Sequence, residues 1–228
     1  MNIVVVGSSG HAKVVIDIIE REGQYTIAGL LDDFRPVGEE AFGYKILGKV
    51  ADLAALVEGY RLEGGTIAVG DNWKRAKIAQ TMLLALPGFS FITAIHPSAQ
   101  IARGVHVGRG TVIMAGVVVN SDSQIGNFCI LNTRSSLDHD CVMEDFSSLA
   151  PGATTGGNVH IGAFSAISLG ANILQGRCIG SHTVIGAGAL VVRDIPDHSL
   201  AYGVPARVIR HREEGESYLE TRPSSSAK

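Results

Sequence analysis

The sequence predicts a small α/β domain followed by a parallel β-helix, and three observations support this prediction. Strand-like and helix-like segments alternate through the first 94 residues. A six-residue repeat then runs without a gap from residue 95 to residue 195. Glycine is abundant, with 28 residues, while aromatic residues make up only 6%, a composition typical of tightly turning backbone. We therefore divide the 228 residues into a Rossmann-like domain over 1–94, a β-helix over 95–195 and a C-terminal segment over 196–228.

Large apolar residues recur at every sixth position from Ile101 to Val191. Fifteen of these sixteen positions are apolar, and Thr155 is the exception. The residue two positions earlier is never large, except at Arg177. Because side chains two apart point the same way in a strand, each unit places one large and one smaller side chain inside. A helix does not keep a period of six on one face. The repeat therefore predicts a hexapeptide β-helix whose three-sided coil takes 18 residues.

The elements of the first domain follow from its apolar pattern. Helices are predicted up to about residue 21 and over 51–59 and 72–86. Strands are predicted over 2–6, 26–31, 66–70 and 89–95. Strands that alternate with helices indicate a parallel sheet, which binds ligands at the carboxyl ends of its strands.

Polar residues follow three of these strands. The turn over residues 7–11, Gly-Ser-Ser-Gly-His, lies at a helix N-terminus, where free N–H groups favour phosphate; a tight turn alone is the alternative. Asp32 and Asp33 are placed to accept from a ribose hydroxyl or a base N–H, or they are a solvated turn. Residues 70–72, Gly-Asp-Asn, precede Arg75, and Asp71 is alternatively just a helix cap. Together these signals favour a ligand that contains a nucleotide.

Composition and charge exclude several classes of protein. The formal net charge is −3, from 19 Lys and Arg against 22 Asp and Glu, so nothing indicates a nucleic-acid-binding surface. With 46% hydrophobic residues the chain is not disordered, and it has no apolar run long enough for a membrane span. The N-terminus lacks the features of a signal peptide. We expect a soluble, cytoplasmic protein that binds neither nucleic acid nor membranes.

The cysteines and most histidines suggest no further chemistry. Cys129 and Cys141 fall in inward positions of the repeat and are expected to pack there. Cys178 points outward, and we expect neither a disulfide nor a catalytic thiol. The histidines show no His-x4-His pair, which argues against a three-histidine metal site of the carbonic-anhydrase type, so no metal is expected.

Several short segments accompany the two predicted domains: the turn over 7–13, the segments over 31–33 and 67–72, Leu131-Asn132-Thr133, His139-Asp140 and Gly203-Val204-Pro205-Ala206-Arg207. With these segments the chain resembles the sugar O- and N-acetyltransferases of the sialic-acid O-acetyltransferase type. This group includes enzymes that acetylate UDP-4-amino sugars and GDP-perosamine. The similarity covers about residues 1–210. The hexapeptide repeat alone is shared by many acyltransferases, whereas its combination with this N-terminal domain is much more specific.

This resemblance implies a left-handed β-helix, a homotrimer with active sites between subunits, and acetyl-CoA in the groove between neighbouring coils. It also implies a nucleotide sugar that is held mainly by the first domain. The substrate-binding residues would be Gly7, Gly10, His11, Asp32, Asp33, Gly70, Asn72 and Asn132. The residues near acetyl-CoA would be Ser148, Gly170 and Arg207. Bacillosamine-type members have a second histidine where this chain has Ser148, so any role of that histidine is missing or moved.

The resemblance makes His139 the general base and Asp140 its partner. Acetyl transfer from a thioester to a sugar amine needs a base, and histidine is suited to this task near neutral pH. A carboxylate fixes the tautomer of the ring and stabilises its charged form. Since Asp138 and Asp140 both flank His139, the residues alone leave the partner open, and in a plain strand both would point away from the ring. Arg207 and Arg210 are placed to meet the phosphates of CoA, or they belong to a solvated tail.

We therefore expect an acetyl-CoA-dependent N-acetyltransferase that acts on the 4-amino group of a nucleotide-linked 4-amino-4,6-dideoxy sugar. O-acetylation of a sugar hydroxyl, such as that of a sialic acid, is the alternative, because it needs the same base. An inactive trimer that only binds a nucleotide sugar is a third hypothesis, disfavoured by the intact His139-Asp140 pair. The residues do not distinguish UDP, GDP and dTDP. Residues 213–228, charged and then serine-rich, are expected to be mobile.

Overall fold

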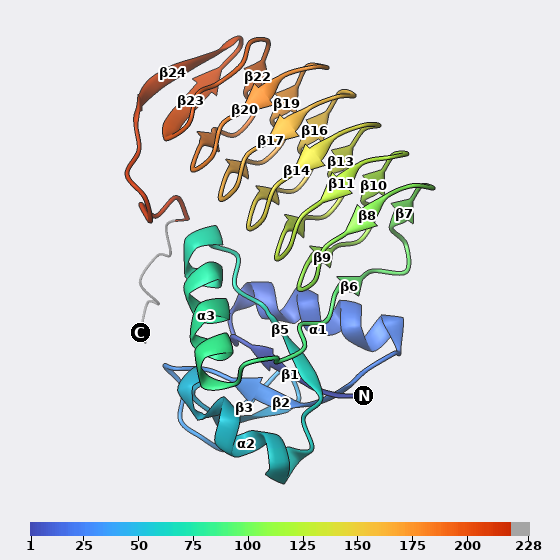
Figure 1. Ribbon diagram of the computed structural model, residues 1–228, viewed down its shortest axis with the longest axis vertical. Coiled ribbons are helices and arrows are strands. Elements are labelled where there is room, and N and C mark those ends of the chain that lie inside the picture. Colours follow the sequence, from blue (N-terminus) through green and yellow to red (C-terminus); the bar gives the residue numbers. More distant parts are fainter. Residues whose placement is uncertain (220–228) are drawn as a thin grey trace, which may run out of the picture.

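The computed structural model describes residues 1–219 and places an α/β domain next to a three-sided β-helix (Figure 1). The sheet of the first domain has the order β3-β4-β2-β1-β5. Its neighbouring strands are parallel, apart from β3 and β4. The elements are β1 (Asn2–Val6), α1 (Gly10–Glu22), β2 (Thr26–Leu31), β3 (Glu40–Ala41), β4 (Tyr44–Gly48), η1 (Val50–Asp52), α2 (Leu53–Tyr60), β5 (Gly64–Ile67) and α3 (Asn72–Ala85). The predicted strands and helices up to residue 67 and the helix from residue 72 are thus confirmed to within a few residues.

Two segments of the first domain differ from the prediction. The β3–β4 hairpin was not predicted, and its two turn residues, Phe42 and Gly43, both have positive φ, as a tight hairpin turn requires. The strand predicted over 89–95 is reduced to a bridge between Phe91 and Gly65 and to β6 (Ala94–Ile95). This segment changes its partner from β5 to β9 of the β-helix midway, so neither ladder extends along it.

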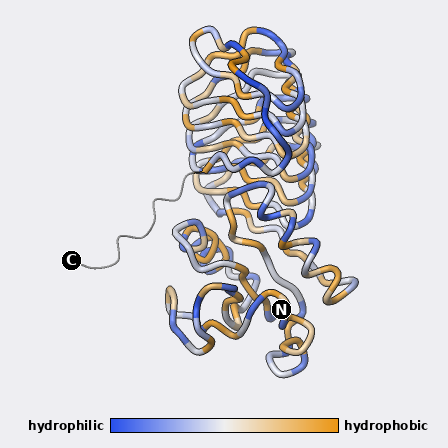
Figure 2. Tube along the Cα trace, turned by 90° about the vertical axis from the view of Figure 1, so that its left-hand side faces the viewer, coloured by the Kyte–Doolittle hydropathy of each residue, from blue (hydrophilic) through white to orange (hydrophobic). Residues whose placement is uncertain are grey.

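The β-helix consists of two-residue strands separated by turns. Strands that lie 18 residues apart pair in parallel, as Val118 does with Ser136, which confirms the predicted coil length. They form three sheets (Figure 1), and the side chains between the sheets make an apolar interior. Hydrophobic and hydrophilic residues alternate along the coils (Figure 2). The strands are β7 (Gln100–Ile101), β8 (His106–Val107), β9 (Val112–Ile113), β10 (Val118–Val119), β11 (Gln124–Ile125), β12 (Ile130–Leu131), β13 (Ser136–Leu137), β14 (Val142–Met143), β15 (Ser148–Leu149), β16 (Thr154–Thr155), β17 (His160–Ile161), β18 (Ala166–Ile167), β19 (Asn172–Ile173), β20 (Cys178–Ile179), β21 (Val184–Ile185) and β22 (Leu190–Val191).

The interior follows the predicted alternation of large and small side chains. Ile113 and Leu131 are completely buried, and so are the small inward residues Ser123 and Cys141. Several buried hydroxyls bond to the backbone of the next coil; the Ser123 hydroxyl, for example, donates to the Asp138 carbonyl and accepts from the Cys141 N–H. The buried Ser135 hydroxyl, in contrast, has no hydrogen-bond partner in the described structure. The expected positions of the cysteines are confirmed, with Cys129 and Cys141 buried and Cys178 exposed.

Three edges separate the sheets. At each edge, one residue in every coil has a positive φ, that is, a left-handed backbone conformation. We name each edge after one of its residues. The Phe146 edge contains Gly110, Phe128, Phe146, Phe164 and His182; the Gly170 edge contains Gly116, Arg134, Gly152, Gly170 and Gly188; the His139 edge contains His139 and the left-handed positions Gly104, Asp122, Asp140, Asn158 and Gly176.

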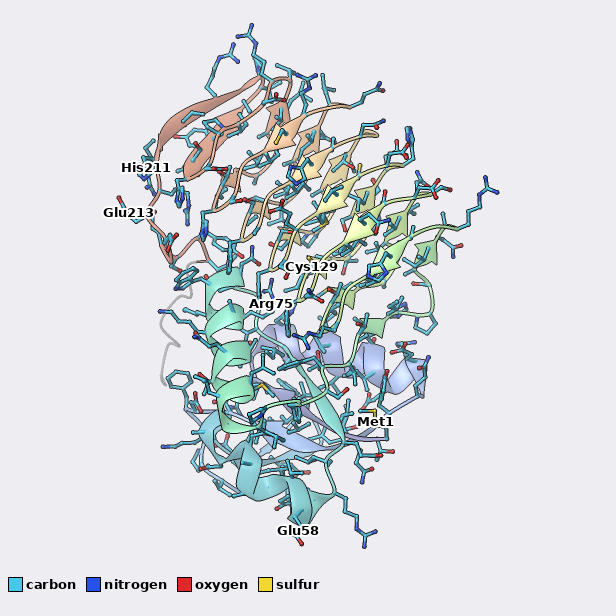
Figure 3. The ribbon with its side chains drawn as sticks, in the orientation of Figure 1. Met1, Glu58, Arg75, Cys129, His211 and Glu213 are labelled. Carbon is cyan, nitrogen blue, oxygen red and sulfur yellow. The ribbon has the colours of Figure 1, made fainter. Side chains whose placement is uncertain are left out.

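Arg75 joins the two domains at the Phe146 edge (Figure 3). Its guanidinium is 1% exposed and donates to the carbonyls of Phe128, Phe146, Val69 and Gly70 and to the Asn72 side chain, at 2.7–3.3 Å. Burial lowers the pKa of Arg75. Its donors are therefore used to hold the start of α3 against the coil, and Arg75 does not point toward a ligand site.

The chain ends in a hairpin that extends one sheet of the β-helix. β23 (Ser199–Gly203) pairs with β21, and β24 (Ala206–His211) pairs with β23. Residues 212–219 then return to α3, where the Tyr218 hydroxyl accepts from the N–H of Asn72 at 3.1 Å. The part of the expected mobile tail over 213–219 thus packs on the fold, and residues 220–228 lie outside the described residues. Within residues 1–219, no helix combines the length and apolar character needed to cross a bilayer.

Candidate active site

A cleft of about 430 Å³ lies at the carboxyl ends of β1 and β2, as predicted for the parallel sheet. Gly7 lines it with a φ of 105°, and a Cβ at this position would lie 3.0 Å from the Ala68 carbonyl oxygen. Glycine therefore lets the chain turn close to the next strand. Gly10 opens α1 behind this turn with open space around it. The free N–H groups of the first turn of α1 suit a phosphate group.

Asp32 and Asp33 also line this cleft. Asp32 accepts from the Ser8 hydroxyl at 2.5 Å and from the Phe34 N–H at 2.9 Å. Asp33 accepts from the Val50 N–H at 2.9 Å through Oδ1, so it also holds the start of η1. Both carboxylates thus shape the loop that follows β2, while they border the space available to a ligand.

Phe34 and Lys74 are among the lining residues that the sequence analysis missed. Phe34 is 97% exposed at the cleft, where its ring offers a flat apolar surface. Lys74 places an ammonium group there from the first turn of α3. The sequence analysis predicted a helix from residue 72, and a helix that follows a strand starts beside the carboxyl ends of the sheet. The position of Lys74 at the cleft could therefore have been predicted.

Four other predicted residues gather outside the cleft, around the returning C-terminal segment. The Asn72 side chain donates to the carbonyls of Phe164 and Ser165 and accepts from Arg75, so it serves the domain junction. A Cβ on Gly70 would lie close to Leu219 and His11, and Ser148 lies beside Tyr218.

Burial, together with the charge of Arg75, lowers the pKa of His11 to about 4. His11 is therefore neutral at pH 7, and its buried Nε2 has no hydrogen-bond partner in the described structure.

His139 and Asp140 form a hydrogen-bonded pair on the surface of the β-helix. The His139 Nδ1 lies 2.7 Å from Asp140 Oδ2. Because a carboxylate only accepts, Nδ1 carries the proton and Nε2 keeps its lone pair. The hydrogen bond with Asp140 raises the pKa of His139 above its ordinary value. The ring is 53% exposed and lies over Gly157 of the next coil, where a Cβ would approach Nε2 to 2.5 Å. Within residues 1–219, Nε2 has no hydrogen-bond partner, so its lone pair is available.

The backbone selects Asp140 over Asp138 as the partner of the ring. Asp140 has a φ of 56°, and this left-handed turn swings its carboxylate back toward His139. Asp138 accepts from the Asn120 amide at 2.6 Å and from the His139 N–H at 2.8 Å, and these two hydrogen bonds lower the pKa of Asp138. Asp138 therefore supports the turn, and Asp140 faces the ring.

The remaining predicted residues lie away from His139 within one chain. Asn132 lies near the Gly170 edge, where its side chain accepts from the Thr133 N–H, and the Gly170 backbone is open to solvent. Arg207 is exposed on β24; among residues 1–219 no carboxylate pairs with it, whereas Arg210 pairs with Glu216. Neither Asn132 nor any residue that lines the first-domain cleft touches His139 in the described structure. The described residues also contain no group of three His, Cys, Asp or Glu side chains placed to hold a metal ion.

Known proteins match both domains. Residues 2–82 match the family described as the PglD N-terminal domain. GDP-perosamine N-acetyltransferase of Escherichia coli O157:H7 is 27% identical over 188 residues, which cover 80% of this chain and 81% of the relative. A variant of GDP-perosamine N-acetyltransferase from Caulobacter crescentus, solved with CoA and GDP-perosamine, is 36% identical, with a TM-score of 0.86 over 91% of this chain and 96% of the other.

A further solved structure is the acetyltransferase domain of PglB from Neisseria gonorrhoeae FA1090 in complex with acetyl coenzyme A. It is 33% identical, with a TM-score of 0.82 over 91% of this chain and 98% of the other. The Caulobacter enzyme was solved with CoA and GDP-perosamine in two forms in which alanine or asparagine replaces one histidine. The chain belongs to the hexapeptide-repeat sugar acetyltransferases of the PglD and sialic-acid O-acetyltransferase type, with a Rossmann-like domain and a left-handed β-helix.

Proposed function

We propose that this protein transfers the acetyl group of acetyl-CoA to the 4-amino group of a nucleotide-linked 4-amino-4,6-dideoxy sugar. The observation that carries the proposal is the exposed His139–Asp140 pair, with Nδ1 bonded to the carboxylate and Nε2 free. The first-domain cleft supplies the second requirement, since Gly7, Lys74 and the start of α1 suit a diphosphate. Relatives that share both domains are named for this reaction or hold its substrates.

The residues around His139 fit a thioester donor. Gly157 leaves room for the ring. Away from His139, at the far end of the β-helix, Arg207 is exposed and forms no ion pair within residues 1–219, so it is available for a phosphate group. Acetyl-CoA supplies an electrophilic thioester carbonyl. As the sugar nitrogen forms its bond to this carbonyl carbon and the bond to sulfur breaks, His139 Nε2 takes the proton of the amine. Asp140 stabilises the imidazolium, which then returns the proton to the departing thiolate.

The complete site forms between subunits of a homotrimer. His139 lies on one edge of the β-helix, whereas Asn132 and Gly170 lie at another edge and the cleft lies in the first domain. The separation of these groups within one chain supports a site that is shared between subunits. A neighbouring copy that presents its Gly170 edge to the His139 edge brings them together.

The acceptor test compares a nucleotide-linked 4-amino sugar with the same sugar without its nucleotide. We expect kcat/KM for the linked form to be higher by at least roughly 10², because the nucleotide supplies binding energy and positions the amine at the base. Thiol release from acetyl-CoA measures both rates across UDP, GDP and dTDP sugars. Equal kcat/KM values would show that the first domain does not hold the acceptor, and would favour O-acetylation of a free sugar acid.

Mixed trimers test the shared site. Lys74→Glu should repel the diphosphate, and His139→Ala removes the base, so each homotrimer should be inactive. Sedimentation equilibrium should give about three times 23.9 kDa for each. Trimers reassembled from a mixture of the two variants should recover activity, because an intact cleft of one subunit meets an intact His139 of another. Absence of recovery in mixed trimers would place both groups in one chain.

Asp140→Asn should change the pH profile as well as the rate. His139 acts as a base only when neutral, so kcat/KM falls as the pH drops through the raised pKa of His139. Loss of the Asp140 charge lowers that pKa, and the acidic limb of the profile should move to lower pH while the plateau rate falls. The titration of the sugar amine affects both proteins equally. An unmoved acidic limb would show that Asp140 does not act on the base.

A further inference from the structure

Three side chains from successive coils form a line on the sheet made by β8, β11, β14, β17 and β20. β14, β17 and β20 are adjacent in this sheet (Figure 1). The Cys178 sulfur lies 3.5 Å from His160 Nδ1, and His160 Nε2 lies 2.9 Å from Glu144 Oε1. Cys178 is exposed, and His160 and Glu144 are 43% and 42% exposed. In a single subunit the line is therefore exposed to solvent.

The order of the groups is that of a nucleophile, a base and an orienting acid. The two ring nitrogens of His160 face different partners, so the histidine bridges the thiol and the carboxylate. The three groups do not converge on one point, as the ligands of a metal ion would. The carboxylate is itself held, because Glu144 Oε2 accepts from the Ala163 N–H at 3.0 Å. With Nε2 protonated toward Glu144, Nδ1 has its lone pair directed at the thiol.

The line lies close to the proposed site of thioester cleavage. The His139 ring rests on Gly157, and Gly157 lies only three residues before His160 on the same coil. Three residues of extended chain span at most about 10 Å. His160 therefore lies within about 10 Å of the residue on which the His139 ring rests, and the Cys178 sulfur is in contact with His160. No sequence motif indicated this arrangement, because the coil stacking, and not a spacing in the chain, places Cys178 over His160.

We propose that Cys178 is a second acyl-accepting group, which takes the acetyl group from acetyl-CoA when no amino sugar is bound. The bond from Cys178 sulfur to the acetyl carbon forms as the bond from that carbon to the CoA sulfur breaks. His160 takes the thiol proton and delivers it to the CoA thiolate, so one thioester replaces another without an oxidant or reductant. This inference rests on the proposed function for the supply of acetyl-CoA.

The environment of the thiol makes the base necessary. Burial and the charges of Asp194, Asp197 and Glu144 raise the pKa of Cys178, so the thiol keeps its proton at neutral pH. Two groups contact Cys178 directly. One is the His160 ring, and the other is Asp194, whose carboxylate accepts from the Cys178 N–H at 3.0 Å and lies 3.6 Å from Arg177. Acetylation should therefore become faster as the pH rises.

The test is intact-mass spectrometry of the full-length protein incubated with acetyl-CoA, or with a small acetyl thioester, without sugar. We expect the mass of one acetyl group to be added, to be released by hydroxylamine as a thioester is, and to map to Cys178. Cys178→Ser should lose it. His160→Gln should slow it by at least roughly tenfold, within the range of a general base, whereas His139→Ala should retain it.

The results separate this inference from the proposed function. If the protein acetylates the amino sugar normally but forms no adduct with either thioester, only the proposed role of Cys178 is overturned. An adduct that forms equally fast in His160→Gln, or that depends on His139, overturns the assignment of His160 as its base. Cys178→Ser and His160→Gln should keep wild-type sugar turnover, which also shows that both variants fold. An adduct from the small thioester without sugar turnover would contradict the proposed function only.

Discussion

Replacing His139 with alanine is expected to lower kcat by roughly 10²–10⁴, the usual contribution of a general base. The His139 ring carries the free nitrogen of the His139–Asp140 pair, and alanine leaves nothing to take the amine proton. Binding of the nucleotide sugar should be retained, since the substitution leaves the first-domain cleft unchanged. Steady-state thiol release measures kcat, and sedimentation checks that the trimer persists.

A matched control is His106→Ala, which removes an exposed histidine from β8 of the β-helix and should leave the rate unchanged. Asp138→Asn should also have little effect, because asparagine can still accept from the Asn120 amide and the His139 N–H. If kcat of His139→Ala lies within about threefold of the wild-type value, His139 stabilises the transition state too little to be the general base. A larger loss at Asp138 than at Asp140 would reverse the choice of partner.

Arg75→Met is expected to destabilise the fold by on the order of 3 kcal/mol, because each buried acceptor left without a donor costs about 1–3 kcal/mol. Methionine fills a similar volume but removes every donor that Arg75 directs at the carbonyls of Phe128, Phe146, Val69 and Gly70. Urea unfolding at one fixed protein concentration measures the change, since the stability of an oligomer depends on concentration.

Gln80→Met is the control for Arg75→Met. It makes a similar change on the exposed face of α3 and should alter stability by no more than about 0.5 kcal/mol. Because Arg75 joins α3 to the coil, its loss should lower the unfolding midpoint of both domains. Equal midpoints for Arg75→Met and Gln80→Met would show that the junction does not depend on this guanidinium.

Much of the candidate site was predictable because its signals are local in the chain. Gly7, Asp32 and Asp33 follow predicted strands, and those strand ends must meet at one edge of a parallel sheet. Phe34 was missed because nothing in its own sequence neighbourhood marks it, whereas Lys74 lies in the first turn of a predicted helix whose start lies beside the strand ends. Asn72 carried the same kind of signal as Asp33, yet it bonds to Phe164 and Ser165, which lie more than 90 residues further along the chain.

The amino-acid sequence by itself determined the two-domain architecture, the 18-residue coil and the inward positions of Cys129 and Cys141. A six-residue repeat fixes which side chains point inward and which point outward, independently of residues far away in the chain. Short segments of the sequence are therefore enough to predict this pattern. The resemblance to known acetyltransferases added His139 and Asp140 to what could be predicted.

Only the tertiary structure decided which groups act on one another. The left-handed backbone at Asp140, not its residue type, selects it over Asp138. The docking of α3 on the Phe146 edge uses Arg75 for the junction, and coil stacking brings Cys178 to His160. These contacts join segments whose distance depends on how strands and domains pack, and packing is settled by the sum of many weak interactions along the whole chain.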